Sequence, residues 1–226
     1  MNDHDMTRAP GPRRAGQRSP STRFFDRWSP TYDRIGLQAV AYRPVHDAVL
    51  ARLVDEEPSV VVDLGCGTGQ LTQRLLDRFP GAEVVAVDLS PGMLAKAAAR
   101  LAPLTPCRHL VVRADAHHLP LARGSVDVVV CTESFHWYRD QPGVLDGLVE
   151  ALVPDGRLLI ASTAMATRPG ERAVRRVSAI SGQPVRALTP GQLRDRLQRA
   201  GFQVTHQRRI PRLGGAWPVL PEARRR

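Results

Sequence analysis

The segment VVDLGCGTGQ, at residues 61–70, contains the residues best suited to holding a ligand. Gly65, Gly67 and Gly69 alternate directly after a run of valines. Glycine lets a loop turn tightly and lets its backbone approach a ligand closely. A dinucleotide-binding loop would read G-x-G-x-x-G, but here the third glycine comes one residue early. Asp63 adds negative charge beside the loop, which suits a cationic ligand better than a pyrophosphate.

Further polar residues follow the next predicted strands. Asp88 lies 19 residues beyond Gly69, near the ~20 at which a carboxylate binds ribose hydroxyls. A carboxylate accepts two hydrogen bonds from a vicinal diol, and it would repel the 2′-phosphate of NADP. Asp115 follows a third strand, and TESFHWY follows a fourth. Each feature alone also fits a tight turn or a helix cap, but the four together predict a ligand site.

The elements that position these residues alternate along the chain. Apolar runs predict buried parallel strands at 59–65, 83–88, 109–115, 126–132, 157–163 and 202–210. Helices are expected at 45–54, 70–79, 90–101, 142–153 and 189–201, with Ser90 and Thr189 as N-caps. This alternation predicts an α/β fold, a doubly wound and mostly parallel sheet with helices on both faces. Ligands bind such sheets at the carboxyl ends of the strands.

Composition is typical of a soluble globular protein whose charge lies mainly at its two ends. The 226 residues are 42% hydrophobic and carry a net charge of +10. Residues 1–28 contribute +3 and residues 205–226 contribute +5, so the body is nearly neutral. Basic ends can attract polyanions, but no aromatic residues interleave with these arginines as in single-strand platforms. We therefore interpret the ends as solvated tails and expect no nucleic-acid partner.

The sequence also bears on membranes, metals and location. No apolar run approaches the ~20 residues of a membrane span, and the first residues do not resemble a secretory signal. Cys66, Cys107 and Cys131 form no CxxC pair. They are expected to be free thiols in a reducing cytoplasm, and no metal site is expected.

Several motifs together resemble the class I S-adenosylmethionine-dependent methyltransferases. They are D-x-G-x-G-x-G, the acidic residue ending the second strand, ADAHHLPL and LVPDGRLLI, and the resemblance covers about residues 30–210. FFDRWSPTYDR and SFHWY are similar to segments of the small-molecule branch, which includes quinone C-methyltransferases and trans-aconitate methyltransferase. The resemblance implies a Rossmann-like methyltransferase fold and S-adenosylmethionine as cofactor. It also implies methyl transfer to a small-molecule acceptor by in-line displacement.

The resemblance implies a cofactor-binding role for a set of residues at the strand ends. Asp88 would hold the ribose hydroxyls, Asp115 the adenine amino group, and Asp63 would lie near the methionine ammonium. Arg43 or Tyr32 would reach the methionine carboxylate. The full predicted set is Asp63, Gly65, Cys66, Gly67, Gly69, Asp88, Leu89, Asp115, Ala116 and Thr132, with Arg43 and Tyr32 in addition.

The aromatic segment after the fourth strand is the predicted acceptor site. Phe135, His136 and Trp137 are expected to contact the acceptor, and His136 and Tyr138 are the catalytic candidates. A general base matters only when the acceptor must lose a proton, and histidine is the usual choice near neutral pH. A structural role for His136 is the alternative. His117 and His118 are further candidates, which equally fit a loop over the adenine.

The resemblance also divides the chain. We expect a disordered basic tail at 1–20, a cap over the active site at 21–44, the methyltransferase domain at 45–220 with a substrate-side insertion at 164–189, and a basic tail at 221–226. LGGAWPVL is a poor seventh strand because it contains two glycines and a proline, so an incomplete sheet edge is expected.

Three other functions stay open at this point. The first is a catalytically silent cofactor-binding module, and the second is a methyltransferase that acts on RNA or protein through the basic ends. The third, an NAD-dependent oxidoreductase, is disfavoured by the glycine spacing and by the lack of a Tyr-x-x-x-Lys pair.

Overall fold

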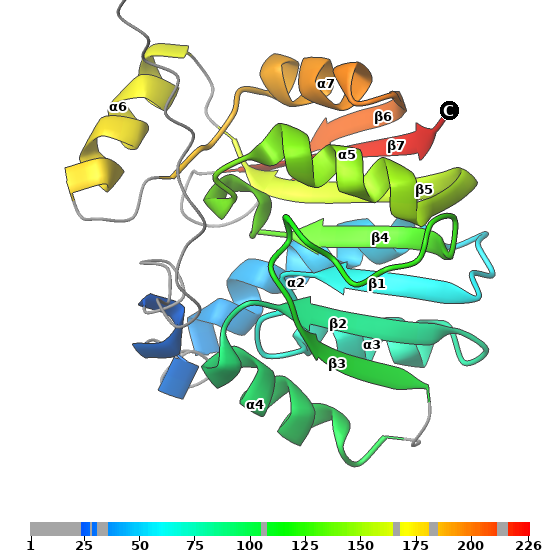
Figure 1. Ribbon diagram of the computed structural model, residues 1–226. Helices are drawn as coiled ribbons and strands as arrows, with labels where there is room; N and C mark the ends of the chain where they lie inside the picture. Colours follow the sequence, from blue (N-terminus) through cyan, green and yellow to red (C-terminus); the bar gives the residue numbers. More distant parts are fainter. Residues whose placement is uncertain are drawn as a thin grey trace, which may run out of the picture.

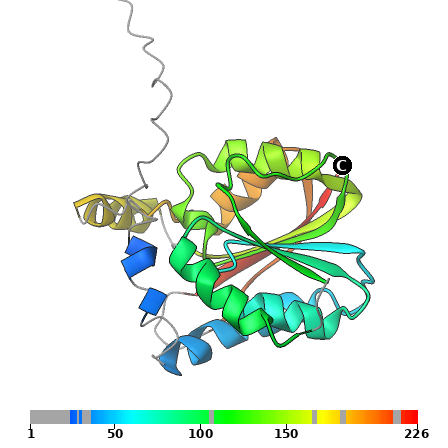
Figure 2. The same ribbon diagram turned by 60° about the horizontal axis from the view of Figure 1, so that its bottom comes forward.

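The protein is built around one sheet with helices on both faces (Figures 1 and 2). The computed structural model describes residues 24–27, 29–30, 36–104, 108–164, 168–180, 185–211 and 217–226. The strands are β1 (Val60–Leu64), β2 (Glu83–Asp88), β3 (His109–Arg113), β4 (Val126–Thr132), β5 (Leu152–Thr163), β6 (Phe202–Arg209) and β7 (Pro218–Arg225). Their order is β3-β2-β1-β4-β5-β7-β6, with β7 antiparallel to both neighbours and the other pairs parallel. The predicted doubly wound, mostly parallel sheet is confirmed.

The helices follow the predicted alternation. They are α2 (Gly36–Ala51), α3 (Gln70–Arg78), α4 (Pro91–Leu101), α5 (Gln141–Ala151), α6 (Arg168–Ile180) and α7 (Pro190–Arg199), with a 3-10 turn η1 (Phe135–Trp137) after β4. Both predicted N-caps are confirmed. The Ser90 hydroxyl accepts from the Met93 N–H at 3.2 Å, and Thr189 forms a reciprocal capping box with Gln192. Helix α2 runs across the predicted boundary between residues 44 and 45, so that boundary is wrong.

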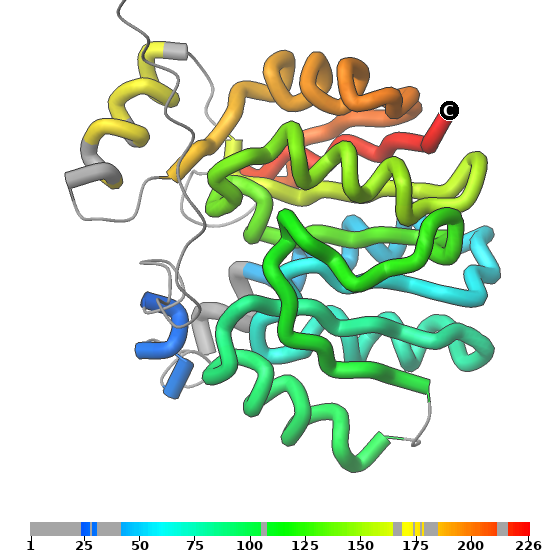
Figure 3. Tube along the Cα trace, viewed as in Figure 1, coloured from blue at the N-terminus to red at the C-terminus, as the bar shows by residue number. Residues whose placement is uncertain are grey.

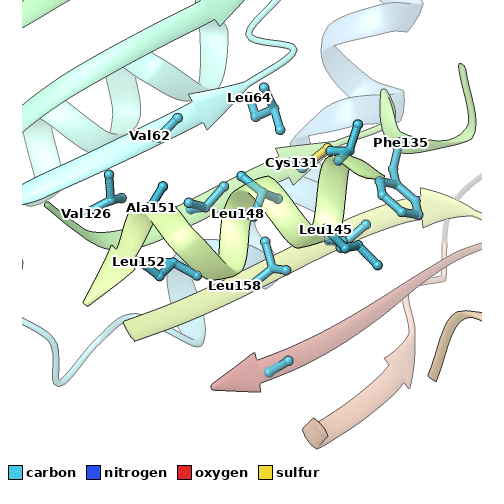
Figure 4. Close-up of a cluster of buried hydrophobic side chains, with 14 of the residues drawn as sticks. Val62, Leu64, Val126, Cys131, Phe135, Leu145, Leu148, Ala151, Leu152 and Leu158 are labelled. Carbon is cyan, nitrogen blue, oxygen red and sulfur yellow. The ribbon is translucent and has the colours of Figure 1, made fainter. Parts of the chain in front are cut away.

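Two hydrophobic layers hold the sheet between its helices. Successive strand residues point to opposite faces, so Val61 packs with α2 and α3 whereas Val62 packs with α5 and α7. Figure 4 shows Leu145 and Leu148 of α5 among the side chains of the second layer. The sheet is thus buried on both faces, as continuous valine runs predict.

The sheet has a complete seventh strand, which corrects the expected incomplete edge. Strand β7 begins at Pro218 and lies between β5 and β6. Pro221 has no backbone N–H, and it pairs with Gln207 of β6 while the register with β5 omits the pair at this position. A proline is therefore tolerated inside the sheet because only one neighbour bonds to it.

The predicted basic tail at 221–226 is also wrong, because residues 221–225 belong to β7. Their side chains are needed inside the fold. Glu222 is 3% exposed, and its carboxylate accepts from Arg52 at 2.6 Å and from Arg157 at 2.5 Å. The charge count alone could not reveal this burial.

Two segments extend the molecule beyond the carboxyl ends of the parallel strands. Figures 1 and 3 show an N-terminal segment (residues 24–27 and 29–30) in blue and α6 in yellow on that side of the sheet. Residues 24–27 and 29–30 are helical. Helix α6 occupies the predicted insertion at 164–189. The predicted tail at 1–20 lies outside the described residues. None of the described helices is both long and apolar enough to cross a membrane.

Candidate functional site

A pocket opens where β1, β2 and β4 end, lined by the glycine loop and by Phe25 of the N-terminal segment. Most of the predicted cofactor residues meet there. Those that line the pocket are Gly65, Cys66, Gly67, Asp88, Leu89, Asp115, Ala116 and Thr132. The carboxyl ends of neighbouring parallel strands meet at one edge of a sheet, which is why residues so far apart in sequence come together.

The glycine loop adopts a backbone that other residues avoid. Gly65, Gly67 and Gly69 have φ angles of 75°, 54° and 78°. A Cβ on Gly65 would lie 2.3 Å from the Ser134 hydroxyl oxygen, so the loop and the segment after β4 touch directly. A Cβ on Gly67 would meet nothing within 4 Å, since that position faces the pocket. Gly69 instead packs on α4, where its Cβ would lie 3.2 Å from Ala97.

Asp88 is held in place by two backbone amides. One carboxylate oxygen accepts from the Gly67 N–H at 3.0 Å and the other from the Ser90 N–H at 2.8 Å. Burial raises the pKa of this carboxyl, and the hydrogen bonds offset part of that rise. Two carboxylate oxygens offer about four acceptor sites, so Asp88 keeps capacity for further donors in the pocket.

Asp63 lies beneath the glycine loop, outside the pocket wall. It is 1% exposed, and one oxygen accepts from the Thr72 hydroxyl at 2.6 Å. Its other oxygen has no hydrogen-bond partner among the described residues. Burial raises the pKa of Asp63 to about 7. This carboxyl group is therefore deeply buried, with one polar neighbour and no cation against it in the described part of the chain, and it changes charge near neutral pH.

Asp115 is braced by His117. Its carboxylate accepts from the His117 backbone N–H at 3.1 Å and contacts the ring Nδ1 at 2.6 Å. Ring Nε2 accepts from the Asp140 N–H at 3.2 Å, so Nδ1 carries the proton in this arrangement. Although burial alone would raise the pKa of Asp115, the bonds from His117 lower it. Asp115 thus faces the pocket as a carboxylate.

Aromatic side chains form part of the pocket wall. Trp137 and Phe25 line the pocket and meet edge to face, with ring centroids 5.4 Å apart. Tyr138 also lines it, and its hydroxyl lies 2.8 Å from the Ser134 hydroxyl. Burial raises the pKa of Tyr138 well above its ordinary value. Tyr138 is therefore a protonated hydrogen-bonding group rather than a base.

The structure does not bring Phe135 and His136 to the pocket, which corrects their predicted acceptor and catalytic roles. Phe135 is 1% exposed and belongs to the core beneath α5. His136 is 6% exposed, and its Nδ1 lies 3.1 Å from the Ser162 hydroxyl of β5. In the 3-10 turn, these two side chains point inward while Trp137 and Tyr138 face the pocket. The structural alternative for His136 is the better one.

The structure describes one of the two predicted carboxylate-binding residues on the N-terminal side, Arg43. Arg43 is exposed and does not line the pocket, whereas Tyr42 and His46 of the same helix do. Burial lowers the pKa of His46 to about 4, so it is a neutral donor or acceptor at pH 7. Tyr32 lies outside the described residues. His118 is exposed and does not line the pocket.

Cys66, predicted as a cofactor-binding residue, is also a packing residue. It lines the pocket but is 8% exposed and packs with Leu94 and Ala97. Burial raises the pKa of its thiol well above the ordinary value, so it stays protonated and is a poor nucleophile.

Several pocket residues were missed by sequence reasoning, and Glu133 and Phe25 are two of them. Glu133 lines the pocket with a φ of 52°, and its carboxylate accepts from Thr163 at 2.6 Å. Positive φ at a non-glycine residue often marks a functional site, but it cannot be read from sequence. Phe25 was missed because an aromatic pair before the first strand also fits ordinary packing. No group of three or more metal-binding side chains gathers anywhere in the described structure.

Comparisons with known proteins agree with this geometry. Residues 61–156 match a family model described as a methyltransferase domain. Malonyl-[acyl-carrier protein] O-methyltransferase of Geobacter sulfurreducens is 33% identical over 187 residues, which cover 79% of this chain and 68% of the relative. Trans-aconitate 2-methyltransferase of Yersinia pseudotuberculosis is 33% identical over 151 residues, covering 67% and 55%. The chain spans about half to two thirds of the length of the curated relatives it matches.

Solved structures share the fold. The 1,6-didemethyltoxoflavin-N1-methyltransferase of Burkholderia thailandensis superposes with a TM-score of 0.69 at 23% identity, covering 99% of this chain and 98% of that one. At this identity the likeness concerns the fold alone. The sequence relatives and the domain match carry the assignment further, and the chain belongs to the S-adenosylmethionine-dependent methyltransferase family.

Proposed function

We propose that the protein transfers a methyl group from S-adenosylmethionine to a small-molecule acceptor. The observation that carries this proposal is the cradle formed by the glycine loop and Asp88. The carboxylate is fixed by the Gly67 and Ser90 amides with acceptor capacity to spare, and a Cβ at Gly67 would project into open space. That arrangement suits a ribose diol lying against a bare backbone.

The residues of the pocket fit the rest of the cofactor. Asp115, braced by His117, would accept from the adenine amino group beside Ala116. Buried Asp63 supplies negative charge under the loop for the cationic methionine end. Tyr42 and His46, which line the pocket where Arg43 does not, would bind the methionine carboxylate as hydrogen-bonding rather than charged groups.

When bound, S-adenosylmethionine supplies an activated methyl group on a sulfonium. The protein then needs chiefly to orient the acceptor and to exclude water. Trp137 and Phe25 form the wall against which an acceptor would lie. Where the acceptor must lose a proton, Glu133 at the end of β4 is our candidate to take it, in place of His136.

The acceptor class remains part of the proposal. Both curated relatives named above have acids in their printed substrates. Arg139 lines the pocket, and Arg172, Arg175 and Arg176 are exposed on α6. Arginine pairs well with carboxylates, so we favour an acidic small molecule, free or carrier-linked. We also expect a cytoplasmic location, since Cys66 and Cys131 are free thiols.

Calorimetric titration with S-adenosylmethionine, S-adenosylhomocysteine and NAD tests the proposal. We expect micromolar binding of the first two, about −8 kcal/mol, and none of NAD. A transfer assay with labelled methyl groups and a panel of carboxylic acids and neutral analogues follows. Binding without transfer to any acceptor would favour a catalytically silent module, and binding of NAD alone would overturn the proposal.

A further inference from the structure

The N-terminal segment (residues 24–27 and 29–30) is bonded to the start of α4. The Asp26 carboxylate accepts from the Ser90 hydroxyl at 2.6 Å and from the Gly92 N–H at 3.2 Å. Ser29 is 5% exposed, and its hydroxyl donates to the Asp26 carbonyl at 3.0 Å. A Cβ on Gly92 would lie 2.6 Å from the Ser29 hydroxyl oxygen. The absence of a side chain at Gly92 is therefore what lets this segment approach so closely.

Ser90 joins this contact to the ribose carboxylate. Its backbone N–H donates to Asp88, while its hydroxyl donates to Asp26 and accepts from the Met93 N–H. A serine hydroxyl has one proton to donate, and here that proton is committed to Asp26. Three residues thus form one path from Asp26, through Ser90, to the carboxylate that faces the pocket.

The same segment supplies part of the pocket wall. Phe25, next to Asp26, lines the pocket and meets the Trp137 ring edge to face at 5.4 Å. Fixing Asp26 on α4 therefore also fixes Phe25 on Trp137. Release of Asp26 would loosen the cofactor carboxylate and open the acceptor wall together.

Charge gives this contact an energetic consequence. Asp26 and Asp88 are like charges on either side of Ser90, and Asp26 contributes to the raised pKa of Asp88, after burial. Partial positive charge at the start of α4 favours carboxylates there. A ligand that donates hydrogen bonds to Asp88 would spread its charge further and ease the repulsion toward Asp26.

We propose that Asp26 is a positioning residue that couples docking of the N-terminal segment (residues 24–27 and 29–30) to occupation of the ribose site through Ser90 and Asp88. The inference rests on the proposed function, because it takes the ligand of Asp88 to be the cofactor. Such coupling is reciprocal. Asp26 should tighten cofactor binding, and the cofactor should hold the segment against α4.

The test compares three variants of the full chain by titration with S-adenosylhomocysteine. Asp26→Ala should weaken binding about tenfold, because two hydrogen bonds to a charged group are lost. Asp26→Asn should stay within about threefold of the wild type, since its amide oxygen can accept the same two bonds. Thr189→Ala removes the N-cap of α7, which lies outside the pocket. It should lower the melting temperature and leave the affinity unchanged.

A second readout separates positioning from general loosening. Exchange of the Gly92 amide, followed by NMR, should slow on adding S-adenosylhomocysteine in the wild type and in Thr189→Ala but not in Asp26→Ala. Unchanged affinity in a folded Asp26→Ala variant, or Gly92 exchange that ignores the ligand, would overturn the coupling while the cofactor assignment stands. Failure of the wild type to bind S-adenosylhomocysteine would instead overturn the proposed function, and the coupling with it.

Discussion

The two ends of the sheet bury their carboxylates in opposite ways. Near the amino ends of the parallel strands, Glu222 meets Arg52 and Arg157, and Arg157 also pairs with Glu56. At the carboxyl ends, Asp63 and Asp88 are bonded by a threonine hydroxyl and backbone amides. One end neutralises its buried charge within the chain. The other keeps negative charge that a cationic or hydrogen-bonding ligand can satisfy.

The pKa shifts follow the same division. At the paired end, burial would raise the pKa of Glu222, but the bonds and charges of Arg52 and Arg157 lower it instead. At the pocket end, burial raises the pKa of Asp63 to about 7 and outweighs the Thr72 bond. The net pKa shifts of these two buried carboxyl groups are therefore opposite in direction. Glu222 has arginines beside it, whereas Asp63 has no cation among its described neighbours.

The largest expected effect is a loss of stability when the ion pairs of Arg157 with Glu222 and Glu56 are removed. Arg157→Ala would leave Glu222 and Glu56 without their shared partner. Removing one member of a buried ion pair typically costs about 3–5 kcal/mol. We expect a loss of that size in denaturant unfolding, with cofactor affinity retained below the transition because the cluster lies far from the pocket end of the sheet.

The matched control is Arg123→Ala. Arg123 also pairs with one glutamate, Glu150 at 2.8 Å, but its side chain is 80% exposed. Its removal should leave the unfolding midpoint unchanged within error. Similar losses of stability in the two variants would mean that burial does not determine how much the Arg157 ion pairs stabilise the fold.

The two ends should also differ in how stability responds to pH. The pKa of Asp63 in the folded protein, about 7, lies above its unfolded value of 3.8. Its stabilising contribution is therefore full below about pH 4 and is lost as the pH rises to about 7. Relative to Asp63→Asn, the wild type should lose a few kilocalories per mole across that window, measured by urea unfolding at each pH.

Glu222 should give the opposite sign. Its pKa is lowered from 4.5 in the folded state, so its contribution is present above about pH 4.5 and is lost as the pH falls further. The free energy of unfolding of Glu222→Gln should be lower than that of the wild type near neutral pH, and the difference should disappear in acid. If the stability contributions of Asp63 and Glu222 changed in the same direction with pH, the contrast between the two ends of the sheet would be wrong.

The last prediction concerns binding rather than stability. Asp88→Ala should weaken S-adenosylmethionine at least tenfold, since charge-assisted bonds are worth ~1.5–3 kcal/mol each. The fold should persist, because Asp88 is only partly buried and has no cationic partner among the described residues. Isothermal titration measures the affinity, and circular dichroism checks the fold.

Asp127 provides a control of similar bonding at the other end. Its carboxylate accepts from the Ser59 and Val60 backbone amides at 2.9 and 2.8 Å. Asp127→Ala should therefore lower stability and leave cofactor affinity unchanged. Equal affinities for Asp88→Ala and the wild type would place the ribose elsewhere.

Much of the fold could be predicted because its signals are local. The valine run of β1, the cap at Ser90 and the capping box at Thr189 each act within a few residues, and all three are confirmed. Strand β7 could not be predicted this way. Its prolines oppose strand formation locally, and only its place between two strands supplies the bonds that compensate.

In the site, too, the residues fixed by local sequence could be predicted and those fixed by distant contacts could not. Gly65, Gly67 and Asp88 were predictable because spacing after a strand fixes where they lie. The turn after β4 was not, since a 3-10 turn of three residues decides which side chains face inward, and it buries His136. Asp26 gave no signal at all, because its partners Ser90 and Gly92 are more than 60 residues away.

The place of β7 has a consequence for how the chain acquires its structure. In the described sheet, β6 bonds to no strand except β7, and β7 carries the last residues of the sheet to leave the ribosome. Residues 202–209 therefore have no strand to pair with until β7 is made, and the edge of β5 that will pair with β7 stays unpaired until then. Pairings between residues so far apart in sequence, such as Arg157 with Arg224, form slowly. During synthesis the nascent protein thus presents an unpaired strand edge that is prone to aggregate.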